Sequence, residues 1–457
     1  MTESLDALPD SAPLVVRTVR IDDPGPLLAL LPDTPETTAW VRRGDGVVGW
    51  GVAAICRTAG ADRFTDAQEW WTEQTRSAVV RDEVDQPGSG VVCFGSFGFA
   101  DDPGDSVLVV PEVVVGRRGS TTWLTTIGVG AISSSRQLRP TEAPRAPRDV
   151  AFSDGALSGT TWETVVAEAV RRINDGQLEK VVLARDLVAT ASSEIDVRWP
   201  LRRLAESYPM CWTFHVDGLF GATPEMLVRR ERGLVTSRVL AGTIRRTGDD
   251  ARDLALAATL ARSSKDLEEH EYAVRSVADA LAPHCSSMNV PESPFVLHLP
   301  NVMHLATDVA GVIHDAADPA GTSLDLAEAL HPSAAVGGTP TDVATALIGE
   351  IEGMCRGRYA GPVGWMDAAG DGEWGLALRS AEIEGPRVRL FAGCGIVADS
   401  DPESELAEAQ AKFVPVRDAL AGRAEVIGGD LGGAARGDVG PDVGPDVGAD
   451  VGADVRG

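Results

Sequence analysis

The stretch of sequence that decides the fold occupies residues 160–189 and reads TTWETVVAEAVRRINDGQLEKVVLARDLVA. In its first half, Trp162, Val166 and Ile173 recur at helical spacing, and Thr160 begins a capping-box pattern typical of a helix N-terminus. The second half is a short, nearly continuous apolar run, as expected for a buried strand. We therefore predict a helix that leads directly into a core strand.

Strand-like runs and amphipathic helices alternate irregularly on both sides of this unit. Strands are predicted near residues 47–52, 91–95, 106–115, 121–129, 211–216, 225–230, 234–240, 295–299, 302–312, 361–366, 374–383 and 387–398. Helices are predicted near residues 252–261, 265–283, 323–330, 340–355 and 403–421. Many strands follow one another like hairpins, and regular strand–helix–strand alternation is missing. The pattern predicts an α/β (α+β) fold with an antiparallel or mixed sheet.

Composition divides the chain into three parts. Residues 1–150 form a strand-rich N-terminal part, and a polar, Pro-rich stretch at 133–154 is expected to be a surface connection to the main region at 151–425. Residues 428–457 are rich in Gly, Ala and Asp and carry five copies of Asp-Val. This repeat has too little apolar mass to bury, so a disordered acidic tail is predicted.

The net charge of −27 over 457 residues argues against nucleic acid or an anionic membrane as a partner, because both bind basic faces. No apolar run has the length of a membrane helix, and the acidic N-terminus lacks the features of a signal peptide. The six cysteines contain no Cys-x-x-Cys pair, which indicates reduced thiols rather than disulfides or zinc ligands. The sequence predicts a cytoplasmic protein.

Lysine is rare in this chain, with three lysines against thirty-eight arginines. A coding bias toward Arg explains the scarcity but not the positions that keep Lys. Lys180 begins a buried apolar run, where a desolvated amine can lose its proton and act as a general base, which Arg cannot do. The alternative is a strand-end lysine whose amine reaches water.

Two acidic motifs are candidates for a metal site. Asp266 and Glu269 are three residues apart on a predicted helix, and Glu405 and Glu408 repeat this spacing on another, so each pair shares a helix face. Carboxylates from two such helices would present oxygen ligands to a hard cation such as Mg²⁺. The alternative is two solvated faces, with Glu408 and Lys412 as an ion pair.

Further candidates border the predicted strands. Glu225 precedes an apolar run, where burial would suit it to donate a proton as a general acid, although a surface turn is an equal expectation. Gly-rich turns at 241–243, 336–340 and 392–396 could bring backbone N–H groups against an anion, but none matches a nucleotide-binding loop. Arg379 could pair with a carboxylate or lie exposed on its strand.

Taken together and in order, ten segments resemble the chorismate-utilising enzymes, a family that includes isochorismate, salicylate, anthranilate and aminodeoxychorismate synthases. The segments are residues 180–185, 221–227, 240–246, 264–270, 304–307, 330–340, 359–365, 372–379, 391–397 and 401–412. Residues 1–150 match only loosely, mainly at 94–99 and 110–112. The resemblance implies a single large domain, with two antiparallel sheets in the core, helices outside and the active site in a cleft.

The resemblance also implies roles for individual residues. It implies Mg²⁺ held by Glu269 and Glu408, with Asp266 and Glu405 in the adjoining shell, and chorismate as the substrate. The residues that would bind or line the substrate are Gly242, Thr243, His304, Ala335, Val336, Tyr359, Arg379, Gly393 and Gly395. Cys394 stands where the family more often has Ala, a change expected to leave the backbone contact intact.

Single residues narrow the choice within the family. Ala241 replaces the lysine that aminodeoxychorismate synthases use, and Lys180 is typically absent from the members that use ammonia. Water is a poor nucleophile and needs a base, so Lys180 points to water and to an enzyme without an amidotransferase subunit. The small residues at 335–336 resemble isochorismate synthases more than salicylate synthases.

We therefore expect an isochorismate synthase, an isomerase in which Lys180 activates water for attack at C2 of chorismate. Glu225 would donate a proton to the departing C4 hydroxyl, and the product would serve menaquinone or siderophore biosynthesis. The alternatives are a salicylate synthase, which goes on to eliminate pyruvate, an anthranilate synthase component I-like enzyme, and a chorismate-binding protein without activity.

Overall fold

The computed structural model describes residues 12–132, 138–299, 302–314 and 321–421, except for the side chains of Lys265 and Glu269. These residues belong to one compact unit. The predicted acidic tail, residues 428–457, lies outside the described residues.

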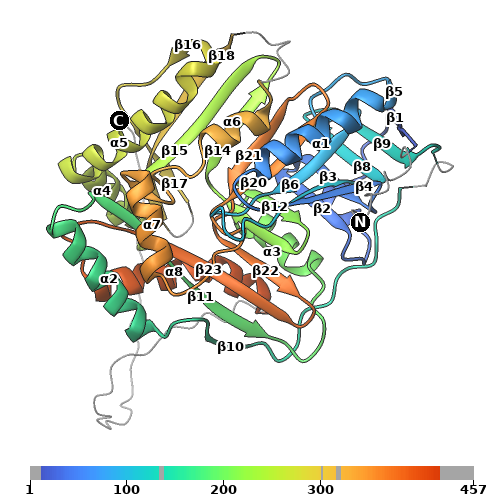
Figure 1. Cartoon of the computed structure of the whole chain (residues 1–457). Helices are drawn as coiled ribbons and strands as arrows, with labels where there is room; N and C mark the ends of the chain where they lie inside the picture. Colours follow the sequence, from blue (N-terminus) through green and yellow to red (C-terminus); the bar gives the residue numbers. More distant parts are fainter. Residues whose placement is uncertain (1–11, 133–137, 300–301, 315–320, 422–457) are drawn as a thin grey trace, which may run out of the picture. The chain divides into compact units, whose positions relative to one another are not determined.

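Two large sheets form the centre of the molecule (Figure 1). The first sheet contains, in spatial order, β10 (Ala151–Asp154), β11 (Lys180–Thr190), β23 (Arg387–Ile396), β22 (Ser380–Glu384), β13 (Leu219–Thr223), β12 (Trp212–Val216), β2 (Thr37–Arg42), β3 (Asp45–Trp50), β8 (Val113–Arg118), β9 (Thr121–Val129), β1 (Leu14–Arg20) and β5 (Val79–Asp82), with β19 (Gly338–Thr339) paired to β11. The second contains β16 (Cys285–Asn289), β18 (Val302–Ile313), β15 (Leu234–Arg245), β14 (Met226–Glu231), β21 (Gly372–Leu376), β20 (Pro362–Asp367), β6 (Val92–Ser96), β7 (Ser106–Val110) and β4 (Ala54–Thr58), with β17 (Phe295–His298) paired to β18. Only β1 and β5 pair in parallel among the described strands, so the predicted antiparallel architecture is confirmed.

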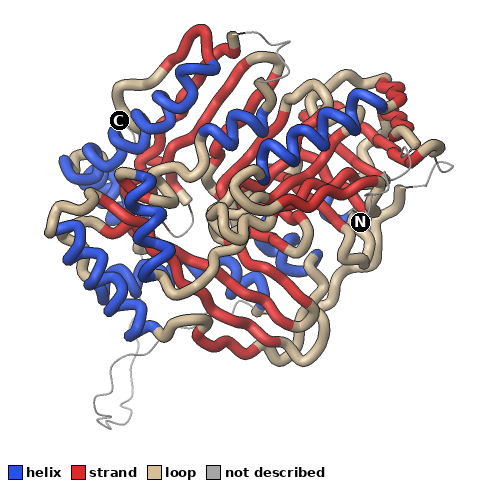
Figure 2. Tube along the Cα trace, in the orientation of Figure 1, coloured by secondary structure: helices blue, strands red, loops and turns tan. Residues whose placement is uncertain are grey.

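The helices lie around these sheets, as Figure 2 shows with helices in blue and strands in red. They are α1 (Arg63–Ser77), α2 (Gly159–Asn174), α3 (Arg198–Ser207), α4 (Asp250–Leu260), α5 (Ser264–Leu281), α6 (Ser323–Ala329), α7 (Thr341–Ile351) and α8 (Pro402–Leu420), with short 3-10 turns η1 (Leu27–Ala29) and η2 (Ala282–His284). Helix α5 packs on β15 and β18, whereas α8 packs on β23 and α7 on β11. Among the described residues, no helix combines the length and apolar character that crossing a bilayer requires.

The largest group of buried apolar side chains draws on both sheets. Val181 and Leu183 of β11 belong to the same cluster as Val228 of β14 and Val235 of β15. Trp162 of α2 joins this cluster, and its indole Nε1 donates to the Ala184 carbonyl oxygen at 3.0 Å. The helix and strand predicted at 160–189 therefore form part of the core that holds the two sheets together.

Several local predictions are wrong, and two helices were not predicted. The N-cap of α2 is Ser158, whose Oγ accepts from the Thr161 N–H at 3.2 Å, so the expected capping box at Thr160 does not form. The single strands expected at 106–115 and 374–383 are each two strands, because the chain turns between β7 and β8 and between β21 and β22. The two members of each pair enter different sheets. Helices α1 and α3 were not predicted, although Phe64 and Trp71 are buried on one face of α1.

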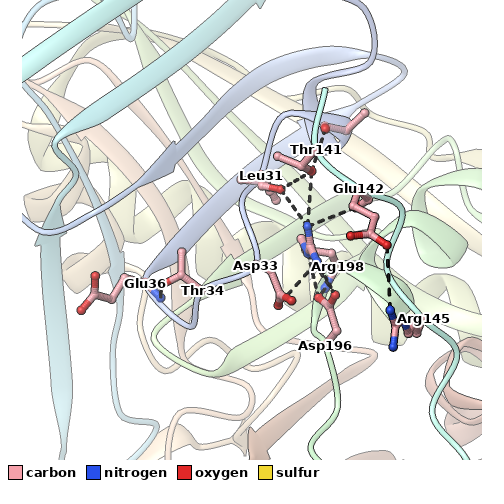
Figure 3. Close-up of polar contacts among 10 residues, drawn as sticks. Leu31, Asp33, Thr34, Glu36, Thr141, Glu142, Arg145, Asp196 and Arg198 are labelled. Carbon is pink, nitrogen blue, oxygen red and sulfur yellow. Dashed lines mark hydrogen bonds and ion pairs between the residues drawn. The ribbon is translucent and has the colours of Figure 1, made fainter. Parts of the chain in front are cut away.

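The polar stretch expected to be a surface connection is partly tied into the fold (Figure 3). Arg198, at the start of α3, is 4% exposed, and its Nη1 donates to the Leu31 carbonyl oxygen at 3.2 Å and to Thr141 Oγ1 at 3.3 Å. Its Nη2 also lies 2.6 Å from Asp196 Oδ2. One buried guanidinium thus links the connection to both the N-terminal part and the main region.

Candidate active site

Two of the crossings of the chain from one sheet to the other lie next to each other. Glu225 lies in the crossing from β13 to β14, and Arg379 lies in the crossing from β21 to β22. The Ala222 N–H donates to the Arg379 carbonyl oxygen at 3.2 Å, and the Leu376 N–H donates to the Glu225 carbonyl oxygen at 3.2 Å. These reciprocal bonds hold Glu225 and Arg379 close together where the sheets meet.

A cleft of about 220 Å³ opens at this junction. Every site residue predicted from the sequence lines it, except Glu269, whose side chain lies outside the described residues. The lining residues that were predicted are Lys180, Glu225, Gly242, Thr243, Asp266, His304, Ala335, Val336, Tyr359, Arg379, Gly393, Gly395, Glu405 and Glu408. Segments far apart in the sequence therefore converge on one concave surface.

Lys180 is the first residue of β11, and its side chain is half-buried at the cleft. It pairs with Thr339 of β19. A Cβ on Gly338 would lie 2.2 Å from the Lys180 carbonyl oxygen, so only glycine permits this close approach of the two backbones. The loop at 333–338 therefore packs against the backbone of Lys180. Ala335 and Val336 of this loop line the same cleft.

A buried ion pair supports this end of β11. Arg356 Nε donates to Glu352 Oε1 at 2.7 Å, and both side chains are nearly inaccessible to solvent. Arg356 also donates to the Val182 carbonyl oxygen at 2.7 Å and to the Val336 carbonyl oxygen at 2.9 Å, while Glu352 accepts from the Ala184 N–H at 2.8 Å. The pair therefore satisfies backbone groups of both β11 and the 333–338 loop.

Glu225 is the buried acid of the cleft, with 7% of its surface exposed. Burial disfavours the charged carboxylate and raises the pKa of Glu225 to about 8, although the positive charges of Lys180 and Arg379 act in the opposite direction. At neutral pH the carboxyl group is mainly protonated and can donate a proton, as the sequence analysis expected of a general acid.

A bulge in β15 shapes the next part of the wall. The pairing of β15 with β18 shifts register between Ala241 and Thr243, and the intervening Gly242 has a φ of +76°. Thr243 Oγ1 lies 2.9 Å from His304 Nδ1. Burial lowers the pKa of His304 to about 3, so the imidazole is neutral, and its Nε2 has no hydrogen-bond partner among the described residues.

Helix α5 is fastened to this bulge by a histidine that the sequence analysis did not single out. His270 is 2% exposed; its Nδ1 lies 3.3 Å from the Ala241 carbonyl oxygen and its Nε2 lies 2.7 Å from Thr307 Oγ1. Asp266, one turn earlier on α5, lines the cleft next to Gly242. His270 thus fixes the face of α5 that carries Asp266.

Carboxylates of α8 gather on another side of the cleft. One carboxylate oxygen of Glu405, one of Glu408 and Cys394 Sγ all lie within 4.8 Å of one another. Ser400 Oγ donates to Glu405 Oε1 at 2.8 Å and orients that carboxylate. Cys394 stands where the family more often has Ala. The residues on both sides of Cys394 in β23 pair with β11, so the strand is regular at this position.

The expected ion pair between Glu408 and Lys412 is confirmed, with Lys412 Nζ 2.7 Å from Glu408 Oε1. Lys412 Nζ also donates to the Gly393 carbonyl oxygen at 2.8 Å. Burial alone would raise the pKa of Glu408. The charge and hydrogen bond of Lys412, together with the charges of Arg379 and Arg245, outweigh burial and leave the pKa below its usual value. Glu408 is therefore a carboxylate at neutral pH.

Two further groups point to binding of an anionic ligand. Arg379 has a φ of +50°, and its Nη1 is buried without a hydrogen-bond partner among the described residues. The ring of Tyr359 stacks on Phe391 with centroids 5.0 Å apart, and burial raises the pKa of its hydroxyl to about 12, so it remains a donor. A buried guanidinium nitrogen without a partner is costly unless a ligand completes its hydrogen bonds.

The model of the chorismate binding enzyme family matches residues 14–421, which is most of the chain. The chain belongs to this family. Isochorismate synthase MenF of Bacillus subtilis (strain 168) is 32% identical over 406 residues, covering 82% of this chain and 85% of that protein. Isochorismate synthase EntC of Escherichia coli (strain K12) is 37% identical over 350 residues, covering 75% of this chain and 84% of that protein.

Solved structures give the same family relationship. The menaquinone-specific isochorismate synthase MenF of Escherichia coli superposes with a TM-score of 0.74 at 25% identity, covering 91% of this chain and 96% of that chain. A putative 2,3-dihydroxybenzoate-specific isochorismate synthase, DhbC of Bacillus anthracis, has a TM-score of 0.71 at 32% identity. The match covers 86% of this chain and 98% of that chain. The predicted fold of a chorismate-binding enzyme is therefore confirmed.

In this chorismate-binding enzyme, three residues that hold the wall of the cleft in place were not predicted from the sequence, and one of them, Arg356, also lines the cleft. Arg356, Glu352 and His270 lie within or beside recognised segments, but nothing in their local sequence marks them as buried and paired. Glu352 and Arg356 do have the four-residue spacing of a helical ion pair, which was the one available signal.

Proposed function

We propose that this protein is an isochorismate synthase, an isomerase that converts chorismate to isochorismate. Family membership and the isochorismate synthases among its relatives support this proposal. The observation that carries it is that Lys180, at the start of β11, and the buried acid Glu225, between β13 and β14, line one cleft. That pair supplies both a proton acceptor and a proton donor for replacing one hydroxyl by another.

In the proposed mechanism, the amine of Lys180 removes a proton from a water that adds to C2 of chorismate. Protonated Glu225 donates to the hydroxyl that departs from C4, so one water enters and one leaves. The raised pKa of Glu225 supports this role, because the acid still holds its proton at neutral pH. Binding the ring between the two groups removes the need for water and both catalysts to meet by chance.

The polar groups without partners account for substrate binding. Arg379 Nη1 is directed to one carboxylate of chorismate, and the Tyr359 hydroxyl and the backbone from Gly393 to Gly395 complete that contact. His304 is neutral, so its Nε2 exchanges a hydrogen bond with a ring substituent without adding charge. We assign Gly242, Thr243, Ala335 and Val336 to the walls around the ring.

The donor set of the cleft fits a hard cation. Asp266 of α5 and Glu405 and Glu408 of α8 supply carboxylate oxygens to one cavity, and these are the ligands that Mg²⁺ prefers. We propose that Glu408 and Glu269 hold Mg²⁺ directly and that Asp266 and Glu405 support them. When bound, Mg²⁺ neutralises the ring carboxylate of the substrate. Lys412 keeps Glu408 ionised, which is the form that a metal ligand requires.

The choice of water over ammonia rests on two positions. Lys180 provides a base that water needs and ammonia does not, and Ala241 offers no amine for a covalent intermediate with the substrate. We therefore propose that the enzyme acts without an amidotransferase subunit. A cytoplasmic location agrees with the absence of a membrane-spanning helix among the described residues.

Incubation of the purified protein with chorismate and Mg²⁺, followed by chromatography and mass analysis, tests the proposal. Isochorismate should accumulate as a stable product, and ammonium salts should not change it. Salicylate with pyruvate would instead identify a salicylate synthase, and anthranilate formed with ammonium would identify an anthranilate synthase. Chorismate binding in calorimetry without any product would identify a binding protein.

A further inference from the structure

The turn between β23 and α8 carries a hydroxyl group at the edge of the cleft. Residues 397–401 form this turn, and α8 packs on β23 directly after it (Figure 1). Ser400 of the turn is half-buried and lines the cleft together with Val397 and Glu405. The Ser400 side chain therefore borders the space in which we propose that Mg²⁺ binds.

Ser400 is held through both its backbone and its side chain. Its N–H donates to the Val397 carbonyl oxygen at 3.1 Å, and the Val397 N–H donates to Ser400 Oγ at 3.1 Å. The hydroxyl thus accepts one hydrogen bond from the backbone and has a single proton of its own to donate. It donates that proton to Glu405 Oε1, which lies 2.8 Å from Ser400 Oγ. These bonds fix the direction in which the hydroxyl points.

The main chain of Glu405 is also fixed. Its N–H donates to the Asp401 carbonyl oxygen at 2.9 Å in the first turn of α8, and its carbonyl oxygen accepts from Cys394 Sγ at 3.5 Å. Bonds to the main chain do not determine the torsions of a glutamate side chain. The bond from Ser400 restricts those torsions, because it holds one carboxylate oxygen of Glu405 at a defined point.

The place where Glu405 is held lies close to Glu408. One oxygen of each carboxylate belongs to a set of atoms that lie within 4.8 Å of one another. Two carboxylates this close repel each other, so a freely rotating Glu405 side chain would turn away from Glu408. The Ser400 hydroxyl opposes that rotation. A divalent cation then meets carboxylates that are already in place, and less of its binding free energy is lost in ordering them.

We propose that Ser400 is a positioning residue that raises the affinity of the cleft for Mg²⁺ by holding the Glu405 carboxylate beside Glu408. The hydroxyl acts through Glu405 rather than by contact with the cation or the substrate. Hydrogen bonds of this kind around a metal site typically change metal affinity by about 10–100-fold. This inference rests on the metal site of the proposed function, to which it adds a residue of the turn between β23 and α8.

Ser400→Ala and Ser400→Thr test the proposal, because only the second variant keeps the hydroxyl. Titration calorimetry of the full-length protein with Mg²⁺, in the absence of chorismate, measures the dissociation constant. We expect Ser400→Ala to raise this constant by about 10-fold and Ser400→Thr to stay close to wild type. The Mg²⁺ concentration that gives half-maximal turnover should rise in Ser400→Ala by the same factor as the dissociation constant.

Ser404→Ala is the matched control for loss of a hydroxyl in this region. Ser404 is exposed in the first turn of α8 and lies outside the lining of the cleft. Its backbone N–H donates to Asp401 Oδ2 at 2.9 Å, and alanine keeps this bond. Ser404→Ala should therefore bind Mg²⁺ as the wild type does. Thermal unfolding without Mg²⁺ checks that each variant is folded.

Three results would overturn the role of Ser400: wild-type Mg²⁺ affinity in Ser400→Ala, equal losses of affinity in Ser400→Ala and Ser400→Thr, or an equal loss in Ser404→Ala. Calorimetry without substrate separates this inference from the reaction. If the wild type bound Mg²⁺ but formed no isochorismate, the proposed function would be wrong, and the Mg²⁺ affinities would still decide the role of Ser400. If the wild type formed isochorismate but bound no Mg²⁺, the metal site and this inference would both be wrong.

Discussion

Glu225 and Glu408 line the same cleft, yet their surroundings give them opposite acid strengths. Burial by itself raises the pKa of both carboxyl groups, although Glu225 is 7% exposed and the Glu408 side chain is 34% exposed. Glu408 has a cation at 2.7 Å, Lys412 Nζ, and its pKa falls below the usual value. The cations around Glu225 do not offset its burial, and its pKa rises to about 8.

The difference divides the cleft into two working halves. The half formed by α5 and α8 holds Glu408 as a carboxylate, as the proposed metal site requires. The half formed by the two sheet crossings keeps one carboxyl group protonated, as a general acid requires. Glu408 differs from Glu225 both in its ion pair with Lys412 and in its shallower burial, and the two differences together separate the two roles.

The largest expected effect comes from removing the proton donor or acceptor. Glu225→Gln and Lys180→Ala should each lower kcat by about 10²–10⁴-fold, because a general acid or base is lost. Mg²⁺ binding measured by calorimetry should be unchanged, since neither residue belongs to the metal half, the part of the cleft formed by α5 and α8 where we propose that Mg²⁺ binds. Lys180→Arg should be as inactive as Lys180→Ala, because a guanidinium keeps its proton.

Glu206→Gln, at an exposed position of α3, serves as the control for removing a surface carboxylate and should leave kcat unchanged. Wild-type turnover by Lys180→Ala would show that another group is the base. Loss of Mg²⁺ binding in Glu225→Gln would show that the two halves are not separate.

Glu408→Gln should produce the complementary pattern. It removes the ionised member of the pair with Lys412, so we expect Mg²⁺ affinity to fall at least about 10-fold. Saturating Mg²⁺ should restore part of kcat, because Glu225 and Lys180 remain in place. Titration calorimetry and the Mg²⁺ dependence of kcat measure the two effects. Glu403→Gln, at an exposed position of the same helix, is the control and should leave both unchanged.

The pH dependence of kcat should reflect the protonation of Glu225. Glu225 is active when protonated and has a pKa of about 8, so the loss of its proton should lower kcat as the pH rises through that value. His304, with a pKa of about 3, stays neutral throughout and should add no acid limb between pH 5 and pH 8. A profile that rises through pH 8 would contradict the assignment of Glu225.

The same shift predicts an effect on stability without Mg²⁺. The pKa of Glu225 in the folded protein lies above its unfolded value of 4.5, so folding stability should fall as pH rises from about 4.5 to about 8. Thermal unfolding at several pH values should show a smaller decline for Glu225→Gln than for wild type. Identical slopes for the two proteins would mean that Glu225 is not the buried acid inferred here.

The smallest expected effect concerns Gly242, the glycine of the β15 bulge that lies next to Asp266 of α5. Gly242 and Gly176 share a φ of +76°, but only a Cβ at 242 would meet other atoms, with Asp266 Cβ at 3.2 Å. Ala at either position should cost about 1–2 kcal/mol of stability through backbone strain. Gly242→Ala should in addition weaken Mg²⁺ binding by displacing Asp266, whereas Gly176→Ala should not. Equal Mg²⁺ affinity in the two variants would contradict the link between bulge and metal half.

The residues that line the cleft were predictable because each lies in a short segment with its own pattern. Lys180 stands at the start of an apolar run, and Asp266 and Glu405 begin pairs at helical spacing. Their convergence was expected only through the resemblance to a family. The bonds that bring Glu225 beside Arg379 join residues about 150 positions apart, and no local pattern encodes such a contact.

Other features lay outside the reach of sequence patterns for physical reasons. Charged residues are expected at the surface, so the buried pair of Arg356 and Glu352 could not be recognised without the structure. The N-cap of α2 was misplaced because several hydroxyl residues precede that helix, and the backbone decides which one caps it. Helix α1 was hidden among strand-like runs, although Phe64 and Trp71 carried its periodicity.

The central claim is that water, activated by Lys180, becomes the new hydroxyl of the product. Conversion of chorismate in H₂¹⁸O with Mg²⁺, followed by mass and NMR analysis of the product, tests it most directly. We predict isochorismate with one ¹⁸O atom in the C2 hydroxyl and no pyruvate. Isochorismate without ¹⁸O, or salicylate with pyruvate, would contradict the account.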